Sequence, residues 1–303
     1  MATSAPLQPA APRRGIKALL ARHPLISYFI ITFVFSWLLL LPGPLTYYGI
    51  LSVSPRLLGY LAIASLLGPA FSGFVMSVAT AGAAGVGDLL RRIVLWRVGV
   101  GWYLFALLGI PAVMVLGTIA LRPGALASFD FSAQPFTLTY LIAFVSIVFI
   151  GGPLLEEPGW SGFAQPRLQR LQGPLVGGLI LGGLWALWHL PGFLIPSQNL
   201  TDIPPRGTVL EFVVFSLALV GLRLVIMWVV NNTRGSVFMA ILTHASWNTF
   251  YSAALIGLFP VRSVLGSYLN LTIAACVLAL VLIALTRGRL GYRLEAAREP
   301  RVR

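Results

Sequence analysis

The sequence predicts an all-α fold, a polytopic bundle of about eight transmembrane helices. Of the 303 residues, 58% are hydrophobic and only 10% are charged, whereas soluble domains carry about 25% charged residues. The mean hydropathy is +0.89. Apolar runs of about 17 residues or more, long enough to cross a bilayer as a helix, recur along the whole chain.

Eight apolar segments are expected to form the spans, with boundaries near 26–43, 57–80, 100–121, 138–157, 174–195, 208–230, 236–258 and 264–286. The stretches 43–56 and 122–137 are expected to be short loops. No shift in composition marks a second domain. We therefore expect a single bundle over residues 26–286, with a basic N-terminal segment at 1–25 and a basic tail at 287–303.

The net charge of +13 would suggest nucleic-acid binding in a soluble protein. Here the basic residues flank the predicted spans, which the positive-inside rule explains better, so no nucleic-acid partner is expected. With a cytoplasmic N-terminus, most of the 21 basic residues fall on the cytoplasmic side, namely Arg13, Arg14, Lys17, Arg22, Arg91, Arg92, Arg97, Arg167, Arg170, Arg234, Arg287, Arg289, Arg293, Arg298, Arg301 and Arg303. We expect an integral protein of a bacterial plasma membrane, with both termini in the cytoplasm.

Ionisable side chains inside a bilayer are costly, so each one is a candidate functional residue. The acidic residues expected outside the bilayer core, in loops, in the tail or near a helix end, are Asp88, Asp130, Asp202, Glu211, Glu295 and Glu299. The titratable residues expected inside it are Glu156, Glu157, His189, Arg223 and His244. The single cysteine, Cys276, excludes an internal disulfide.

The two intramembrane glutamates stand between helix-breaking residues, in the order Gly151-Gly152-Pro153-Leu154-Leu155-Glu156-Glu157-Pro158-Gly159. This composition predicts a broken or ending helix. Broken helices at membrane depth are tolerated where they line a cavity or are buried in protein. Because adjacent helical residues point about 100° apart, one carboxylate is expected to face a cavity and the other to support it.

Both intramembrane histidines have partners at helical spacing. His189 follows Trp185 by four residues, and Gly178 and Gly182 continue that face, so His189 is expected to face the bundle interior. Asn248 follows His244 by four residues and lies above it on one helix face.

These residue types suit the hydrolysis of a peptide bond without a covalent intermediate. A carboxylate with a histidine can activate a water molecule, and a second histidine with an asparagine can stabilise an oxyanion. No cofactor is certain. Zinc is the alternative, held by Glu156, His189 and His244, although the H-E-x-x-H signature is absent.

Helix depths present a difficulty for this convergence. If the fifth span begins at Pro174, His189 lies about 22 Å along it, and His244 lies about 12 Å into its own span. Glu156 is expected near the cytoplasmic end of the fourth span. The three residues meet only if the fifth span begins outside the core, is tilted, or begins later.

Together the three segments resemble the CAAX protease and bacteriocin-processing family of intramembrane proteases, which includes the prenyl-protein endopeptidases. Its motifs are a double glutamate followed by an arginine, an aromatic residue four positions before a histidine, and a histidine four positions before an asparagine. The matching segments lie in family order within about 138–250, as Glu156-Glu157-Pro158-Gly159-Trp160-Ser161-Gly162, Trp185-Ala186-Leu187-Trp188-His189-Leu190-Pro191 and His244-Ala245-Ser246-Trp247-Asn248.

The resemblance implies an intramembrane endopeptidase with an eight-helix fold and a polar cavity open toward the cytoplasm and the membrane. Glu156, aided by His189, would activate the attacking water, and Glu157 would support the site. His244 and Asn248 would stabilise the oxyanion. The implied partners are the bilayer and a peptide or protein substrate, which can itself be membrane-anchored. Eukaryotic members remove the last three residues of prenylated proteins, whereas some bacterial members are tied to bacteriocin immunity or export.

One position departs from the family pattern. The arginine expected after the double glutamate is Ser161 in this chain. An arginine there would pair with a carboxylate and hold its charge. We hypothesise that Arg223, about 15 residues into an inward-running span, replaces it.

Three alternatives remain open at this point. Without the motif arginine, the chain would be a catalytically impaired immunity or scaffold protein. The order Gly159-Trp160-Ser161-Gly162 also fits the Gly-x-Ser-Gly of rhomboid-type serine proteases, in which Ser161 would form a dyad with a histidine. A transporter would use the same glutamates and histidines as a proton relay, although inverted repeats are not evident.

Overall fold

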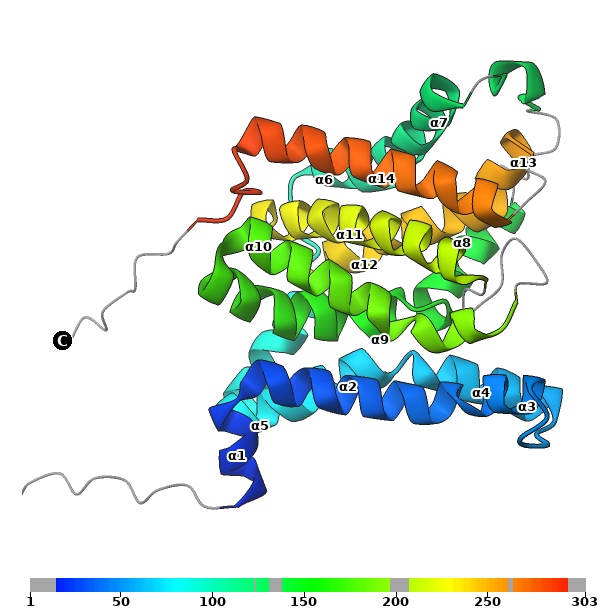
Figure 1. Cartoon of the computed structure of the whole chain (residues 1–303). Coiled ribbons are helices and arrows are strands. Elements are labelled where there is room, and N and C mark those ends of the chain that lie inside the picture. Colours follow the sequence, from blue (N-terminus) through cyan, green and yellow to red (C-terminus); the bar gives the residue numbers. More distant parts are fainter. Residues whose placement is uncertain (1–14, 123, 131–137, 197–206, 261–263, 294–303) are drawn as a thin grey trace, which may run out of the picture.

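A computed structural model describes residues 15–122, 124–130, 138–196, 207–260 and 264–293, and within these ranges every regular element is a helix (Figure 1). The α-helices are α1 (Ile16–Arg22), α2 (Pro24–Leu40), α3 (Pro42–Tyr47), α4 (Pro55–Ser65), α5 (Gly68–Ile93), α6 (Val100–Leu104), α7 (Ile110–Leu121), α8 (Leu138–Ile150), α9 (Pro153–Glu157), α10 (Gln165–Trp188), α11 (Val209–Asn232), α12 (Val237–Phe250), α13 (Ile256–Leu258) and α14 (Val264–Thr286). The π-helices are η1 (Phe105–Gly109), η3 (Pro158–Ala164) and η5 (Tyr251–Leu255), and the 3₁₀-helices are η2 (Leu126–Ser128) and η4 (Leu190–Leu194).

The predicted all-α polytopic bundle is confirmed. Within the described residues, six helical runs are long and apolar enough to cross a membrane, and one of them, Leu138–Trp188, has 51 residues. That run contains the predicted span 138–157 and most of the predicted span 174–195, which accounts for part of the difference from about eight. Large apolar side chains lie on the surface, among them Leu38 at 66% and Val209 at 81% exposure. Such a surface requires lipid contact, so the chain is an integral membrane protein.

Several predicted boundaries and environments are wrong. The predicted span 57–80 is divided between α4, which ends at Ser65, and α5, which starts at Gly68 and runs to Ile93. Pro69 lacks an amide hydrogen and therefore suits the first turn of a new helix. The extension of α5 places Asp88 in a helix rather than a loop, 2.6 Å from Arg91.

Loop predictions are corrected in the same way. The stretch 43–56 contains most of α3, and η2 lies within 122–137. Glu211 forms a capping box with Thr208 at the start of α11, which agrees with its predicted place near a helix end. The predicted positions of Asp202, Glu295 and Glu299 fall outside the described residues, as do residues 1–14 and 294–303 of the predicted end segments.

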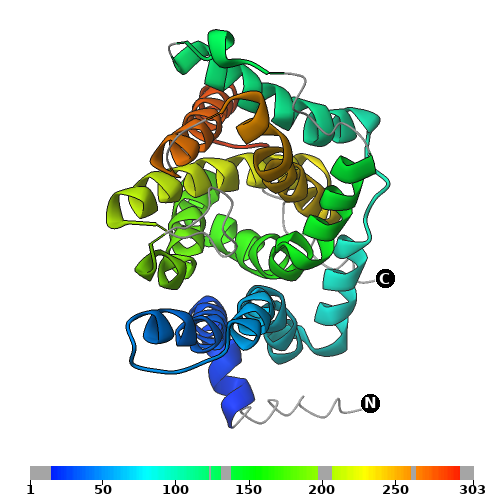
Figure 2. The same cartoon turned by 90° about the vertical axis from the view of Figure 1, so that its right-hand side faces the viewer.

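The helices form two layers, with α1 to α5 below α8 to α14 in the orientation of Figure 1, and Figure 2 shows the same division from the side. The layers approach most closely where α5 crosses η3. An ideal Cβ on Gly73 would lie 3.0 Å from the Cα of Gly159, and one on Gly159 would lie 2.1 Å from the carbonyl oxygen of Pro69. Only glycines permit this backbone contact. The N-terminal layer therefore packs directly on the segment that follows the two glutamates.

Helix α11 is the most buried of the six spans and packs between α10 and α14. Glycines again allow the close approach: an ideal Cβ on Gly182 would lie 2.8 Å from the Cα of Val220, and one on Gly221 would lie 2.8 Å from the backbone of Ala275. The prediction that the Gly178–Gly182 face packs against a neighbouring helix is confirmed.

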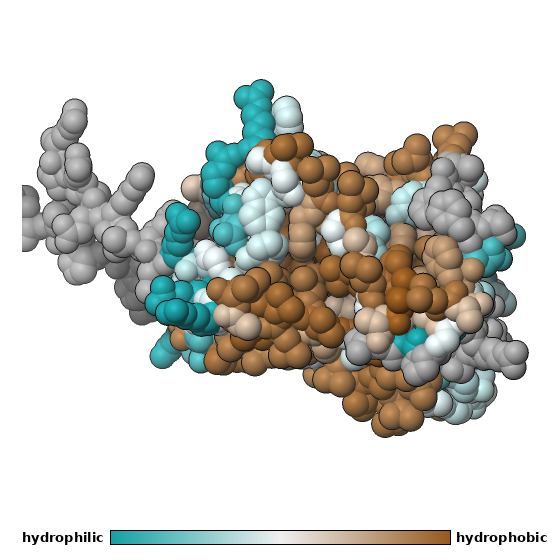
Figure 3. Space-filling view, turned by 90° about the horizontal axis from the view of Figure 1, so that it is seen from above, coloured by the Kyte–Doolittle hydropathy of each residue, from teal (hydrophilic) through white to brown (hydrophobic). Residues whose placement is uncertain are grey.

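Hydrophilic residues collect at one end of the bundle, at the left of Figure 3, and the broad middle is apolar. Contacts between the turns at this end hold it together. Arg234 donates to the carbonyl oxygen of Arg97, and Asn231 donates to that of Leu290. Arg122 lies at the opposite end, where it donates to the carbonyl oxygen of Pro260. Basic residues predicted to share one side of the membrane thus group at one end of the molecule.

Candidate active site

The predicted helix break before the glutamates is confirmed. Helix α8 ends at Ile150, and Gly152 adopts φ +109°, a left-handed conformation that favours glycine. Pro153 then occupies the first turn of α9, where its missing amide hydrogen costs nothing. Glu156 and Glu157 therefore lie near the start of a new helical segment, not at the end of the fourth span as predicted. The segment continues through the π-helix η3, which begins at Pro158.

A second break explains how Glu156 and His189 reach the same depth. Gly173 within α10 has φ +76° and ψ 167°, so the chain reverses there and Pro174 starts a returning arm. An ideal Cβ on Gly177 would lie 3.0 Å from the Leu168 backbone, which shows that the arms pack tightly. Glu156 precedes Gly173 by 17 residues and His189 follows it by 16, so both lie about 25 Å from the bend at 1.5 Å per residue.

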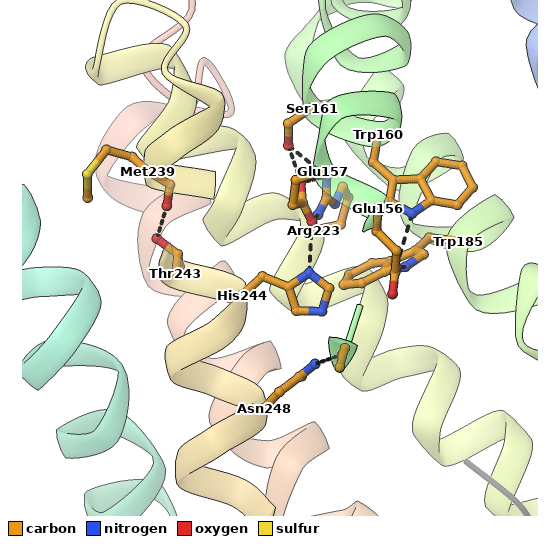
Figure 4. A network of polar contacts seen from close by, with 11 residues as sticks. Glu156, Glu157, Trp160, Ser161, Trp185, Arg223, Met239, Thr243, His244 and Asn248 are labelled. Carbon is orange, nitrogen blue, oxygen red and sulfur yellow. Dashed lines mark hydrogen bonds and ion pairs between the residues drawn. The ribbon is translucent and has the colours of Figure 1, made fainter. Parts of the chain in front are cut away.

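Glu157 is fully buried at the centre of a polar network (Figure 4). Its Oε1 accepts from Arg223 Nη2 at 2.7 Å and lies 3.0 Å from His244 Nδ1. Its Oε2 accepts from Arg223 Nη1 at 3.2 Å and from the Ser161 hydroxyl at 2.5 Å. A two-point contact with a guanidinium is the strongest hydrogen-bonded pairing open to a carboxylate. Helices α9, α11 and α12 are thereby joined by one carboxylate.

Arg223 approaches the position at which the family motif has its arginine. Its Nη1 lies 3.1 Å from the Ser161 hydroxyl, and its guanidinium carbon lies 4.6 Å from the centre of the Trp185 ring. The Ser161 hydroxyl thus contacts Glu157 and Arg223, and within the described residues it bonds to no histidine. This geometry does not support the serine–histidine dyad considered from the sequence.

Glu156 has a different environment from its neighbour. One oxygen, Oε2, accepts from the indole N–H groups of Trp185 at 2.8 Å and Trp160 at 3.2 Å. Neutral donors stabilise a carboxylate without cancelling its charge. In the described part of the chain no residue donates to Oε1, so this oxygen is open to a bound water or substrate.

The two histidines are each fixed through Nδ1. In His189 this atom lies 2.8 Å from the carbonyl oxygen of Trp185, which can only accept, so Nδ1 carries the hydrogen. In His244 it faces the carboxylate of Glu157, which accepts in the same way. In both rings Nε2 is left for chemistry. The His244 ring also packs on Trp185, with centroids 5.1 Å apart.

The predicted site residues line one cavity of about 120 Å³, with one exception. Glu156, His189, His244 and Asn248 lie on its wall, whereas Glu157 lies behind the wall. Asn248 is placed at the Gly151 break by a long hydrogen bond of 3.5 Å to that carbonyl oxygen. Sequence reasoning did not identify the other lining residues that surround these polar groups, which include Leu40, Ser65, Leu66, Trp188, Phe215, Tyr251, Ser252 and Tyr268.

Trp185 contacts four of the polar residues at the site and was not singled out as functional from the sequence. It donates to Glu156, accepts from His189, and packs on both His244 and Arg223. Its position four residues before His189 was the available signal.

The donor set does not assemble a zinc site. Among the described residues, no group of three histidine, cysteine, aspartate or glutamate side chains is close enough together to hold a metal ion. The geometry of the described residues therefore does not favour the alternative of zinc at Glu156, His189 and His244.

Known proteins match the central part of the chain. Residues 138–250 match the family described as type II CAAX prenyl endopeptidase Rce1-like. Over 138 residues, 44% of this chain, the sequence is 26% identical to CAAX prenyl protease 2 of Methanococcus maripaludis. The chain spans about half of that relative, 49% of its length. The family match includes all five predicted site residues and leaves the N-terminal layer outside.

Proposed function

We propose that this chain, whose residues 138–250 match the type II CAAX prenyl endopeptidase Rce1-like family, is an intramembrane endopeptidase that cleaves peptide bonds by direct attack of water. The observation that carries the proposal is the convergence of Glu156, His189, His244 and Asn248 on one cavity. These groups come from three separate segments, α9, the end of α10, and α12. They supply a base and an oxyanion site, the two requirements of the reaction.

In the proposed mechanism, Glu156 activates the water. Its Oε1 accepts a hydrogen bond from the water while Trp185 and Trp160 hold Oε2. The water oxygen attacks the substrate carbonyl carbon, and its proton passes to Glu156, with His189 Nε2 as an additional acceptor. The C–N bond then breaks, the proton goes to the amine nitrogen, and the products are a carboxylic acid and an amine.

The negative charge on the tetrahedral intermediate is stabilised by His244 and Asn248. With Nδ1 of His244 directed at Glu157, a protonated ring presents Nε2–H to the oxyanion. The Asn248 amide supplies a second donor from the next turn of α12. Donors placed in advance at a buried site act strongly on a developing charge.

Glu157 and Arg223 are assigned supporting roles. Arg223 pairs with Glu157 at two points, which lowers the cost of burying that carboxylate. Ser161 is small enough to leave room for a guanidinium that arrives from α11, and it adds a hydrogen bond. We propose that Arg223 replaces the motif arginine, so that the departure at position 161 leaves the site competent.

We also propose a substrate preference and an orientation in the membrane. The apolar cavity wall formed by Leu40, Leu66 and Phe215 favours a peptide with apolar side chains next to the cleaved bond. The grouping of basic residues at one end supports two cytoplasmic termini under the positive-inside rule.

Cleavage of a peptide library by the purified protein in detergent tests the proposal. Wild type is compared with Glu156→Ala and His244→Ala, each with and without a chelator. We expect cleavage by wild type only, unchanged by the chelator. Chelator-sensitive cleavage would contradict the metal-free mechanism. A folded wild type that cleaves nothing would contradict the protease function and favour an immunity or scaffold role.

A further inference from the structure

Arg92 lies near the end of α5, in the N-terminal layer and outside the matched region, yet it reaches the backbone of two active-site segments. Its Nη1 donates to the carbonyl oxygen of Gly162 at 2.8 Å, and its Nη2 donates to that of Ser161 at 3.1 Å. Its Nε donates to the carbonyl oxygen of Gly235 at 2.8 Å. All three guanidinium nitrogens are therefore engaged by main-chain acceptors.

The carbonyl groups in η3 need these donors because of Pro166. In a regular α-helix the amide of residue 166 would donate to the carbonyl of Gly162, and in a π-helix it would donate to that of Ser161. Proline has no amide hydrogen, so neither bond can form. Arg92 supplies both missing donors from another helix. A buried carbonyl group without a hydrogen-bond donor costs free energy, so the Arg92 contacts should stabilise η3.

The third contact of Arg92 reaches the start of α12. Gly235, with φ +77°, forms the turn before the N-cap Ser236, whose hydroxyl donates to the carbonyl oxygen of Leu95. Helix α12 carries His244 and Asn248. One rigid guanidinium thus joins η3, which continues directly from the two glutamates, to the beginning of the helix that carries the proposed oxyanion donors.

We propose that Arg92 is a positioning residue that fixes η3 relative to α12, and so sets the geometry between Glu157 and His244. The proposal rests on the proposed function for its catalytic consequence, but the backbone contacts do not depend on that function. It also assigns the N-terminal layer a part in the active site. A lysine keeps the charge but lacks the planar array of donors, so it cannot replace all three bonds.

Four variants test the proposal: Arg92→Met, Arg92→Lys, Pro166→Ala combined with Arg92→Met, and Arg91→Met as the control. Arg91 is the exposed neighbour that pairs with Asp88, so its replacement removes an arginine of the same helix turn without touching η3. Hydrogen–deuterium exchange is measured over 158–166 and 235–248 in detergent. Peptide cleavage by the folded fraction is measured in parallel.

Faster exchange in both segments is expected for Arg92→Met, and no change for Arg91→Met. For Arg92→Met, kcat should fall about 100-fold, the loss expected when reacting groups are displaced by about 1 Å. KM should stay within about twofold of the wild-type value. Arg92→Lys should recover only part of this loss. Pro166→Ala restores an amide donor for the η3 carbonyl groups. In the Arg92→Met background it should raise kcat about fivefold, which corresponds to the free energy of one hydrogen bond.

Unchanged exchange in Arg92→Met would overturn the proposal whatever the activity. Faster exchange in Arg92→Met together with a wild-type kcat would also overturn it. The proposal would fail as well if the activity of Arg92→Met fell only in proportion to the amount of folded protein. If the wild type cleaves no peptide, the proposed function is refuted. The role of Arg92 is still tested in that case, because the exchange measurement does not depend on cleavage.

Discussion

Replacement of Arg223 by methionine tests the assigned role of the relocated arginine. The substitution keeps much of the apolar stem and removes the two hydrogen bonds to Glu157, the bond to Ser161 and the contact with Trp185. Glu157 would then be a buried carboxylate without its cationic partner. Removal of one member of a buried ion pair costs about 3–5 kcal/mol. That loss corresponds to a fall in Tm on the order of 10 °C for a domain of this size.

The assay compares Tm and peptide cleavage for Arg223→Met, Glu157→Gln and Arg170→Met in the same detergent. Arg170 is exposed, so the same substitution there should change neither quantity. We expect Arg223→Met to be at least as damaging as Glu157→Gln, because it leaves the Glu157 carboxylate, which contacts His244, buried without its cationic partner.

A second variant separates the lost guanidinium from general damage to the core. Position 161 stands four residues after Glu157 on the same helix face, so an arginine there can reach the carboxylate. Ser161→Arg combined with Arg223→Met should therefore recover Tm and activity relative to Arg223→Met alone. A wild-type Tm and cleavage rate for Arg223→Met would refute the reasoning. A double variant whose Tm and cleavage rate are no higher than those of Arg223→Met would also refute it.

Three further predictions concern individual groups at the cavity. Ser161→Ala removes the hydroxyl contacts with Glu157 and Arg223 but leaves the direct pair between those two residues, so the cleavage rate should fall by less than about tenfold; complete loss in a steady-state assay would instead indicate a serine nucleophile. Trp185→Phe keeps the ring and removes the 2.8 Å donor to Glu156, so the rate should fall by about tenfold or more, the value of a hydrogen bond to a charged group; an unchanged rate would contradict the assigned role of the indole. Asn248→Ala should lower kcat by about 100-fold with little change in KM, as for loss of an oxyanion donor; a change in KM alone would indicate substrate binding.

Local chemistry made part of this site predictable from the sequence. Glycine and proline around the glutamates indicated a broken helix, and Gly152 provides it with a positive φ. Spacings of four residues placed Trp185 with His189 and His244 with Asn248 on common faces, and these faces point into one cavity. Arg223 was singled out because a charge inside a span needs a partner.

The remainder depends on tertiary contacts that a periodic pattern does not encode. The apolar run 57–80 was predicted as one span, although α5 begins at Gly68 within it. Two successive helices in lipid can be joined by apolar residues, so hydropathy alone does not mark the boundary. The reversal at Gly173 removed the expected depth conflict, but one glycine among many gives no such signal. From the sequence, Arg92 was interpreted only as a cytoplasmic charge between the predicted spans 57–80 and 100–121. Its three carbonyl acceptors lie about 70 and 143 residues away in sequence, so no local pattern indicates them.

The most direct test of the account is the isosteric change Glu156→Gln, measured as single-turnover cleavage of a peptide selected from the library. It exchanges one carboxylate oxygen for an amide nitrogen and leaves the helix break, Glu157 and Arg223 in place. The account predicts an unchanged Tm and a loss of at least about 1000-fold in rate, because the proposed base is gone. Cleavage within tenfold of wild type would contradict the assignment of Glu156 as the group that activates water.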